Sequence, residues 1–366
     1  MTDRRDRASM EMALGLAAKA SGRTSPNPCV GAVLVKDGVI VGWGHHEAAG
    51  RPHAEAVALL RAGRKARGAT LYVTLEPCVH WGRTPPCADA LIEAGVKRVV
   101  AADLDPNPIV LTKGAARLHA AGIEFEHGLL ADRNLQLNRH YMHYIGGHIP
   151  FVTLKAAVSL DAKMARPEGD GLWLTSPAAR AYAHLLRAEH DAVLVGAGTV
   201  LADDPLLSVR HPNWPGRRIT RVVMDGRLRT PPGARLLSDK RGGPVLVFTG
   251  PAAPAKKRAA LEKAGAEVIG LPLKKGVLDL DEALRVLGQR DLTGVLIEGG
   301  ARMIAAAIAP TRFQRLVLMI APLIIGGAEV VSFYGAAGAP AIPRALRLRR
   351  MTRFTIGPDT IVEGGI

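Results

Sequence analysis

Residues 70–93 read TLYVTLEPCVHWGRTPPCADALIE, and they set the architecture of the first half of the chain. Residues 70–75 are apolar and rich in β-branched side chains, which predicts a strand. Residues 87–93 have the pattern of a helix. One Pro-Cys pair, Pro77-Cys78, ends the strand, and a second, Pro86-Cys87, begins the helix. The stretch therefore predicts a strand–loop–helix unit with a cysteine at each junction.

The segments on either side continue this alternation. Apolar residues at helical spacing predict helices, and short apolar runs predict strands. The turn Lys36-Asp37-Gly38 predicts a hairpin. The expected helices are 9–20 and 55–66, and the expected strands are 29–36, 39–41 and 97–102. Strands that alternate with helices predict a sheet of largely parallel strands covered by helices.

The pattern breaks at Gly146-Gly147 and Pro150, which marks a domain boundary. A length of 366 residues also predicts about two domains. We therefore expect one domain over 1–146 and another over 150–366. In the second, the expected strands are 151–158, 192–195, 221–224, 245–248, 294–297, 317–320 and 354–356, and the expected helices are 176–190, 255–264 and 279–287.

The composition indicates a folded, basic protein. Apolar residues make up 48% of the chain, which excludes a mainly disordered protein. The 48 Lys and Arg against 33 Asp and Glu give a net charge of +15, which favours anionic partners. Because the basic residues are spread along the chain, we expect phosphorylated small molecules rather than nucleic acid.

The same composition predicts a cytoplasmic protein. No apolar run reaches the roughly 20 residues of a membrane span, and no signal-peptide pattern follows Met1, so we expect no membrane contact. Three cysteines are too few for a disulfide framework in a chain of this length. They fit a reducing compartment, where cysteines are available for metal binding or catalysis.

Three residues form a set that Zn²⁺ prefers: His53, Cys78 and Cys87. Three protein ligands leave the fourth tetrahedral position to water, which is typical of a catalytic site. Glu55 lies two residues after His53, so it can move a proton from that water to a departing amine without binding the metal. We expect Cys29, by contrast, to be a small core residue.

Zinc nucleobase deaminases carry H-x-E followed by P-C-x-x-C. Here the two cysteines are separated by eight residues, and this longer interval resembles that of the bifunctional riboflavin-biosynthesis deaminase–reductase family. The resemblance is carried by residues 74–87, 26–31, 46–52 and 105–108. It implies a cytidine-deaminase-like, three-layer α/β/α domain. It also implies contacts with the pyrimidine and ribose phosphate at Asn27, His46, His80, Asp105 and Asn107.

The second half resembles the reductase domain of the same family. The matching segments are 151–155, 159–161, 173–176, 185–187 and 195–207. The resemblance implies a dihydrofolate-reductase-like α/β fold that uses NADPH, which agrees with the absence of a G-x-G-x-x-G fingerprint. Ile297-Glu298-Gly299-Gly300 ends a strand and begins a helix, and that geometry suits a phosphate.

Carried over to this chain, the resemblance assigns two sets of reductase residues. Those at dinucleotide positions are Ala157, Trp173, Thr199, Asp203, Gly300, Ala301, Arg302, Met303 and Ile304. Those at substrate positions are Lys155, Gly171, Arg187, Leu207, Arg210 and Glu298. The two arginines suit a ribose 5′-phosphate, because a guanidinium fork matches phosphate oxygens.

Two positions depart from the family pattern. Thr112 and Ala162 stand where the family usually has Gly. If the backbone at Ala162 requires a positive φ, the alanine there is strained.

The expected protein is a cytoplasmic enzyme of riboflavin synthesis. One Zn²⁺ would serve the deamination of 2,5-diamino-6-ribosylamino-4(3H)-pyrimidinone 5′-phosphate, and NADPH would then reduce the ribosyl chain to ribityl. We also expect a homo-oligomer, a dimer or a tetramer. Two alternatives remain: a nucleic-acid deaminase with the same zinc set, and a zinc-stabilised binding module, which would need a fourth protein ligand.

Overall fold

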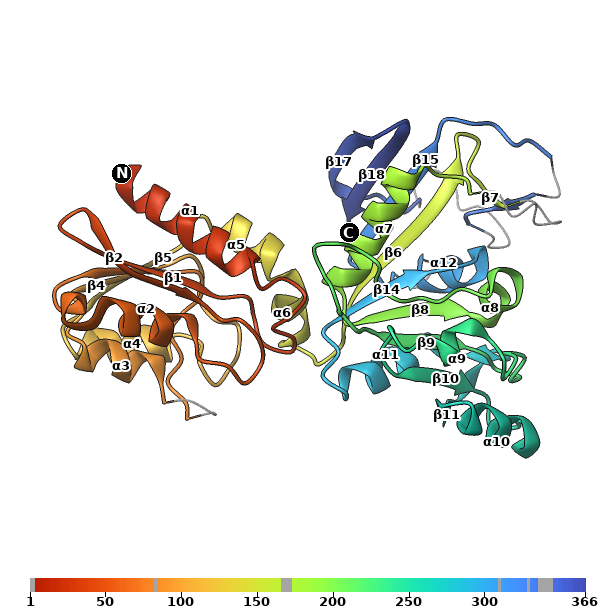
Figure 1. Cartoon of the computed structure of the whole chain (residues 1–366), viewed down its shortest axis with the longest axis horizontal. Coiled ribbons are helices and arrows are strands. Elements are labelled where there is room, and N and C mark those ends of the chain that lie inside the picture. The colour runs from red at the N-terminus through yellow and green to blue at the C-terminus, as the bar shows by residue number, and fades with distance from the viewer. Residues whose placement is uncertain (1–3, 82–84, 166–172, 309–310, 328–329, 335–344) are drawn as a thin grey trace. The chain divides into compact units, whose positions relative to one another are not determined.

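The computed structural model describes residues 4–81, 85–165, 173–308, 311–327, 330–334 and 345–366. The chain forms two compact units, Met1–His148 and Ile149–Ile366, both drawn in Figure 1. Among the described residues, every helix is too short or too polar to cross a membrane.

The first unit is a five-stranded sheet between two layers of helices (Figure 1). Its strands follow the order β2-β1-β3-β4-β5. Helices α2, α3 and α4 pack on one face, and α1 packs on the other. The elements are α1 (Arg4–Ala18), β1 (Gly31–Lys36), β2 (Val39–His45), α2 (Ala54–Ala62), η1 (Gly63–Ala66), β3 (Thr70–Val73), α3 (Cys87–Glu93), β4 (Arg98–Ala101), α4 (Lys113–Ala120), β5 (Glu124–His127), α5 (Ala131–Leu137) and α6 (Arg139–Tyr144). The expected three-layer α/β/α fold is confirmed.

The expectation of largely parallel strands is only half right in this unit. Strands β3, β4 and β5 are parallel, but β1 is antiparallel to both β2 and β3. The reason is the tight turn at Asp37-Gly38, because so short a connection can join only antiparallel strands. The returning strand β2 continues to His45, well past the expected end at residue 41.

Two glycines of β2 allow α2 to lie directly on the strand backbone. A Cβ at Gly42 would stand 2.3 Å from the carbonyl oxygen of Ala58, and one at Gly44 would stand 2.6 Å from that of Ala54. Neither distance is compatible with a side chain. The helix that begins next to His53 can therefore pack directly on β2, because Gly42 and Gly44 carry no side chain.

The second unit is built on a nine-stranded sheet of order β11-β10-β9-β8-β14-β6-β15-β18-β17. All of its neighbouring strands are parallel except the β15–β18 and β18–β17 pairs. Helices α11 and α12 pack on one face, and α8, α9 and α10 pack on the other. Besides the short strands β7, β12, β13 and β16, the longer strands β11 and β18 were not predicted from the sequence.

The elements of this unit are β6 (Phe151–Ser159), β7 (Lys163–Ala165), α7 (Pro177–Glu189), β8 (Ala192–Gly196), α8 (Ala197–Asp203), β9 (Thr220–Met224), α9 (Arg235–Ser238), β10 (Val245–Thr249), α10 (Ala255–Lys263), β11 (Ala266–Gly270), β12 (Leu273–Lys274), β13 (Val277–Leu278), α11 (Leu280–Gly288), β14 (Gly294–Glu298), α12 (Ala301–Ile308), β15 (Arg315–Ala321), β16 (Val331–Ser332), β17 (Arg349–Ile356) and β18 (Asp359–Gly365).

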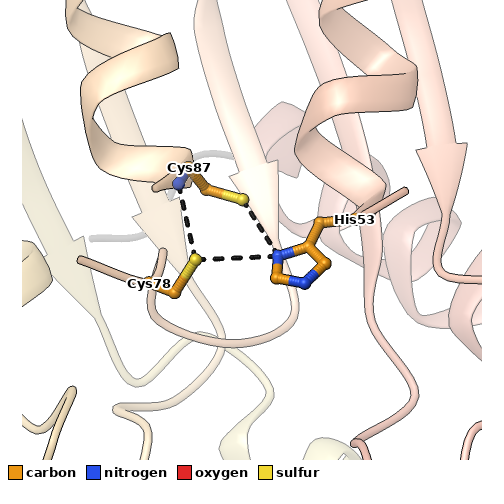
Figure 2. A group of neighbouring side chains, drawn as sticks. All are labelled: His53, Cys78 and Cys87. Carbon is orange, nitrogen blue, oxygen red and sulfur yellow. Dashed lines mark hydrogen bonds between the residues drawn. The ribbon is translucent and has the colours of Figure 1, made fainter. Parts of the chain in front are cut away.

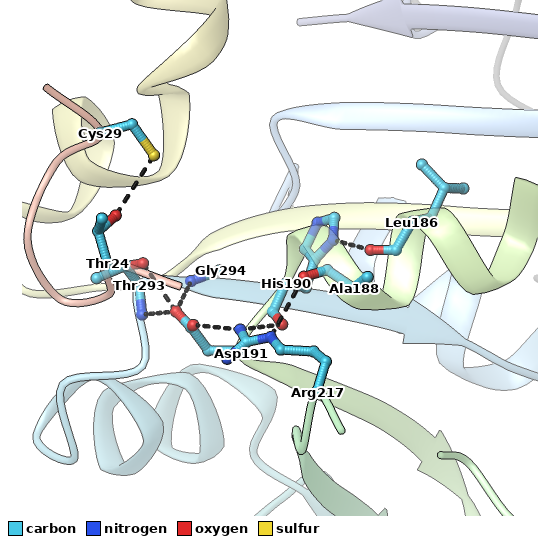
Figure 3. Close-up of polar contacts among 9 residues, drawn as sticks. All are labelled: Thr24, Cys29, Leu186, Ala188, His190, Asp191, Arg217, Thr293 and Gly294. Atoms are coloured by element: carbon cyan, nitrogen blue, oxygen red, sulfur yellow. Dashed lines mark hydrogen bonds and ion pairs between the residues drawn. The ribbon is translucent and has the colours of Figure 1, made fainter. Parts of the chain in front are cut away.

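A buried carboxylate fixes the amino ends of two central strands of this sheet (Figure 3). One oxygen of Asp191, just before β8, accepts hydrogen bonds from the backbone and hydroxyl of Thr293 at 2.9 and 2.8 Å and from the backbone of Gly294 at 3.2 Å. Its other oxygen pairs with Arg217 at 3.2 Å. Since parallel strands run the same way, this contact leaves their carboxyl ends available for a site at the opposite edge.

The backbone at Ala162 is left-handed, with φ of 62°. It lies in the turn between β6 and β7, where Asp161 accepts hydrogen bonds from the backbone of Ile325 and Gly326. Thr112 likewise has φ of 62°. Both positions where the family usually has Gly therefore adopt the conformation that glycine favours, which explains that preference.

We expect Gly44→Ala to destabilise the first unit by about 1–3 kcal/mol, because its Cβ would overlap the α2 backbone. Hydrogen exchange followed by mass spectrometry should show faster exchange in β1, β2 and α2 and unchanged exchange in the second unit. Gly15→Ala is the control, because a Cβ there meets no atom within 4 Å. Equal protection in both variants would rule out the close-approach argument.

We expect Ala162→Gly to raise the stability of the second unit by up to about 1 kcal/mol, because glycine adopts a left-handed backbone without strain. The check is the melting temperature of the full chain. As a control, Ala259→Gly in α10 should lower it, because there glycine replaces an exposed helical alanine. A lower melting temperature for Ala162→Gly would contradict the assignment of strain.

Candidate active sites

The first candidate site brings together His53, Cys78 and Cys87 (Figure 2). His53 immediately precedes α2, Cys78 follows β3, and Cys87 is the first residue of α3. The imidazole Nδ1 lies 3.2 Å from the Cys87 sulfur and 3.6 Å from the Cys78 sulfur. The backbone N–H of Cys87 also donates to the Cys78 sulfur at 3.4 Å. The one nitrogen and two sulfurs thus converge on one point.

The electrostatics of this cluster suit a divalent cation. Hydrogen bonds from Cys87 and His53 lower the pKa of Cys78 to about 4, despite its burial. The hydrogen bond to Cys78 raises the pKa of His53. The hydrogen bond to Cys78 and burial raise the pKa of the Cys87 thiol. A thiolate is therefore already favoured, and a cation would allow both sulfurs to be thiolates. The described residues of the cluster offer three ligands, which matches an open zinc site rather than a four-ligand structural one.

Glu55 lies in the first turn of α2, with only 4% of its surface exposed. Burial raises the pKa of its carboxyl to about 7, and the negative charge of Cys78 adds to the effect. A carboxyl with a pKa near neutrality can both accept and return a proton, as a general acid–base requires.

His46 and Asn27 lie beside the cluster. The ring of His46 meets that of His53 edge to face, with centroids 5.6 Å apart. The Nδ1 of His46 is 3.1 Å from the carbonyl oxygen of Pro52, which can only accept, so Nδ1 carries the proton. The Nε2 then accepts from the Asn27 amide at 3.2 Å. The Asn27 and His46 side chains are therefore hydrogen-bonded to each other, and His46 also contacts Pro52 and His53, just before α2.

The other predicted substrate contacts differ in orientation. Asp105 is buried, and its Oδ1 accepts from the backbone of Asn107 at 2.9 Å and from the hydroxyl of Tyr141 at 2.8 Å. The side chain of Asn107 accepts from the backbone of Ile109. His80 is exposed, and no described contact joins it to the cluster. Cys29 is buried, as expected, and its sulfur lies 3.4 Å from the Thr24 hydroxyl (Figure 3).

The sequence analysis missed Glu76, which directly precedes Pro77-Cys78. Its buried carboxylate accepts backbone hydrogen bonds from Asp105, Thr112 and Ala115 at 3.0–3.3 Å. Glu76 therefore connects the loop that contains Cys78 to the segment that leads into α4. An acidic residue between an apolar strand and a Pro-Cys pair is the only local signal, and it does not reveal these partners.

The second candidate site lies near the carboxyl ends of β14 and β8. Glu298 ends β14 and stands beside Lys155 of β6 in the register of the two strands. The Glu298 carboxylate forms a two-pronged ion pair with Arg187 of α7 at 2.6 and 2.8 Å, and its Oε2 is 3.9 Å from the Lys155 amine. Burial opposes ionisation, but the two cations hold the pKa of Glu298 at about 2. Two buried cations and one anion leave this cluster positive.

The predicted phosphate arginines differ in availability. Each nitrogen of Arg187 already donates within the protein, to Glu298 and to the carbonyl oxygen of Ser208. Arg210 is exposed. The one hydrogen bond described for its side chain is donated by the guanidinium to the Ser208 hydroxyl at 3.3 Å. Burial and the neighbouring Arg187 and Arg210 lower the pKa of His184 to about 4, so it adds no charge near neutral pH. Arg210 is thus better placed than Arg187 to contact a phosphate directly.

Six of the predicted dinucleotide residues, Thr199 and residues 300–304, lie at or beside the start of α12. The hydroxyl of Thr199 in α8 accepts from the backbone of Gly300 at 3.4 Å. Of the residues that follow Gly300, Ala301 and Ile304 are buried, Met303 is half-buried and Arg302 is exposed. The short helix therefore presents mainly its backbone and Arg302 to a ligand.

The remaining predicted positions have varied surroundings. Asp203 is the exposed last residue of α8, whereas its neighbour Asp204 is the capping residue and accepts from the backbone of Arg235. The side chain of Leu207 is buried in the core, so only its backbone can reach a ligand. Trp173 is exposed and lies under the Arg180 guanidinium. Ala157 is half-buried in β6, and Gly171 lies outside the described residues.

Comparison with known families divides the chain in the same way. Residues 3–103 match the cytidine and deoxycytidylate deaminase zinc-binding region. Residues 150–362 match the RibD C-terminal domain. Two curated relatives are the riboflavin biosynthesis proteins RibD of Aquifex aeolicus and Escherichia coli. The former is 43% identical and covers 98% of this chain and 97% of the relative; the latter is 38% identical and covers 97% of each.

Solved structures extend the similarity to the whole fold. Acinetobacter baumannii RibD superposes with a TM-score of 0.89 at 36% identity, covering 99% of both chains. A Thermotoga maritima protein superposes with a TM-score of 0.85 at 34% identity, covering 99% of this chain and 98% of that one. Its title describes a diaminohydroxyphosphoribosylaminopyrimidine deaminase/5-amino-6-(5-phosphoribosylamino)uracil reductase.

We expect Glu298→Ala to destabilise the second unit by about 3–5 kcal/mol, because Arg187 and Lys155 would lose their buried counter-charge. The Glu298 pKa is lower in the folded than in the unfolded chain, so its ionisation stabilises the fold above about pH 4.5 and that contribution is lost as the pH falls towards 2. Chemical denaturation between pH 2 and 7 should show a shallower pH dependence for Glu298→Gln than for the parent. Identical slopes would argue against the ion pair.

Proposed function

The chain belongs to the RibD family of riboflavin-biosynthesis enzymes, and from this we propose which residues carry out its two reactions. The enzyme is a zinc-dependent deaminase and an NADPH-dependent reductase. The proposed substrate is 2,5-diamino-6-ribosylamino-4(3H)-pyrimidinone 5′-phosphate. We assign its deamination to residues 1–146 and the following reduction of the ribosyl chain to residues 150–366.

In the deaminase half, we assign zinc binding to His53, Cys78 and Cys87 because their donor atoms lie within 4.8 Å of one another. Bound zinc supplies the Lewis acidity that makes water nucleophilic near neutral pH. Glu55 accepts one proton of the attacking water and delivers it to the pyrimidine nitrogen, and then relays the second water proton to the amine, which departs as ammonia. Asn27 and His46 orient the ring beside the zinc helix.

In the reductase half, bound NADPH would supply the hydride for reduction of the ribosyl chain, and opening of the sugar requires a proton at the ring oxygen. Lys155, whose amine lies 3.9 Å from Glu298, is the proposed source of that proton, because burial lowers its pKa whereas the Arg187 guanidinium does not release a proton. Glu298 keeps Lys155 and Arg187 in place. Arg210 is the proposed phosphate contact, and Thr199 with Gly300 forms the proposed dinucleotide contact.

The single observation that best supports the proposal is the convergence of the half-buried His53 and Cys78 with the buried Cys87 beside Glu55, in a chain that also matches the RibD C-terminal domain. A nucleic-acid deaminase would have no use for residues 150–366, so that alternative is abandoned. A cytoplasmic location and a dimeric or tetrameric assembly remain proposals drawn from the sequence.

We expect Glu55→Gln to retain zinc and to lose deamination by about 10²–10⁴-fold, because the variant keeps the side-chain size but cannot relay a proton. Metal analysis and ammonia release from the diaminopyrimidine phosphate provide the two measurements. Normal deamination, or loss of zinc, would refute the assigned role.

We expect the Asp203→Ala variant to catalyse reduction of the ribosyl chain at least about 10-fold more slowly than the parent. The reason is that the substitution removes a carboxylate proposed to orient the sugar or the cofactor ribose. Deamination should continue, so the deaminated ribosylated intermediate accumulates with NADPH present, as product mass would show. Asp204→Asn is the control, since it keeps an oxygen for the Arg235 backbone. Parent-like reduction by Asp203→Ala would limit Asp203 to a structural role.

A further inference from the structure

Asn138, between α5 and α6, is bonded to both backbone polar groups of Cys29. Its Oδ1 accepts from the Cys29 N–H at 2.7 Å, and its Nδ2 donates to the Cys29 carbonyl at 3.0 Å. The Nδ2 also donates to Asn134 at 2.8 Å. Asn138 is 3% exposed and lies 109 residues along the chain from Cys29. It therefore substitutes for a neighbouring strand along the segment that contains Asn27.

Tyr141 lies three residues further on in α6 and contacts a different loop. Its hydroxyl donates to the Asp105 carboxylate at 2.8 Å. The same oxygen accepts from the backbone of Asn107, and the Asp105 N–H donates to Glu76. Tyr141 and Asp105 are both buried. The loop of Asp105 and Asn107 is therefore held from α6 on one side and from the zinc loop on the other.

These two loops carry three of the five proposed pyrimidine-phosphate contacts: Asn27, Asp105 and Asn107. Asn138 and Tyr141, three residues apart, thus reach both loops through buried side chains that are hydrogen-bonded within the protein. The match to the deaminase zinc-binding region ends at residue 103, so this helix lies beyond it.

We propose that Asn138 and Tyr141 are positioning residues of the deaminase, which fix its two substrate loops from a single helical segment. This inference rests on the proposed function, because the family resemblance behind that function assigns Asn27, Asp105 and Asn107 to the substrate. Since neither residue touches the zinc cluster, the expected effect of removing them is on substrate affinity rather than on metal binding or proton transfer.

The test compares full-length Asn138→Ala, Tyr141→Phe and the double variant with the parent. We expect KM for deamination to rise about 10-fold in each single variant and further in the double variant, with kcat within about threefold of the parent. Zinc content and reduction of the pre-deaminated intermediate should be unchanged. Asn138→Asp, which keeps the acceptor for the Cys29 N–H, should recover part of the affinity.

Tyr72→Phe is the matched control, because it also removes a buried tyrosine hydroxyl bonded to an aspartate, Asp6, in the same unit. It should leave KM at the parent value. A parent-like KM in both Asn138→Ala and Tyr141→Phe would overturn the proposal. So would a KM change equal to that of Tyr72→Phe, because the effect would then be one of general stability.

Hydrogen exchange separates this inference from the proposed function. Asn138→Ala should speed exchange at residues 27–30, and Tyr141→Phe should speed exchange at residues 105–110. Unchanged exchange in both loops would overturn the positioning role even if a variant lost activity by misfolding. If the parent itself fails to deaminate the pyrimidine phosphate, the proposed function is wrong, and loop exchange alone then decides whether the two residues hold the loops.

Discussion

The deaminase half depends on the direct contact between the α2 backbone and two glycines of β2. Gly42 and Gly44 let the helix lie closer than any side chain would permit. This close packing of α2 on β2 places His53 and Glu55 within reach of Cys78, which follows β3, and of Cys87, which begins α3. A metal site made from three separate elements requires such rigid packing, because its ligands must converge without large adjustments.

The two sites handle buried charge in opposite ways. In the deaminase half, burial and a neighbouring thiolate raise the pKa of Glu55 towards neutrality, which suits a group that must exchange protons. In the reductase half, Lys155 and Arg187 keep Glu298 ionised, so its role is to hold cations in place. The pKa values of these two buried carboxylates differ because of the sign of the nearest charge, which agrees with the proton relay proposed for Glu55 and the positioning role proposed for Glu298.

Much of the fold followed from local pattern. The alternation of strands and helices was predicted, and α3 has the predicted bounds Cys87–Glu93. Helix α2 ends at Ala62 and continues as the 3₁₀ turn η1, where a single helix to residue 66 was expected. The predicted hairpin of β1 and β2 is confirmed, but the expectation of a largely parallel sheet did not take its antiparallel strands into account. Strands β11 and β18 were missed because their periodicity is weak over so few residues.

The candidate zinc ligands, Glu55, the two-part organisation and the family could all be predicted from the sequence, because these predictions depend on residue type and short spacing. The tertiary structure was needed to reveal three contacts. Glu298 forms an ion pair with Arg187, Asp204 is the C-terminal capping residue of α8, and Asn138 is hydrogen-bonded to the Cys29 backbone. The tertiary structure also showed the left-handed backbone at Ala162 and Thr112. Such contacts join residues up to 111 positions apart, so they depend on the path of the chain, which local spacing does not encode.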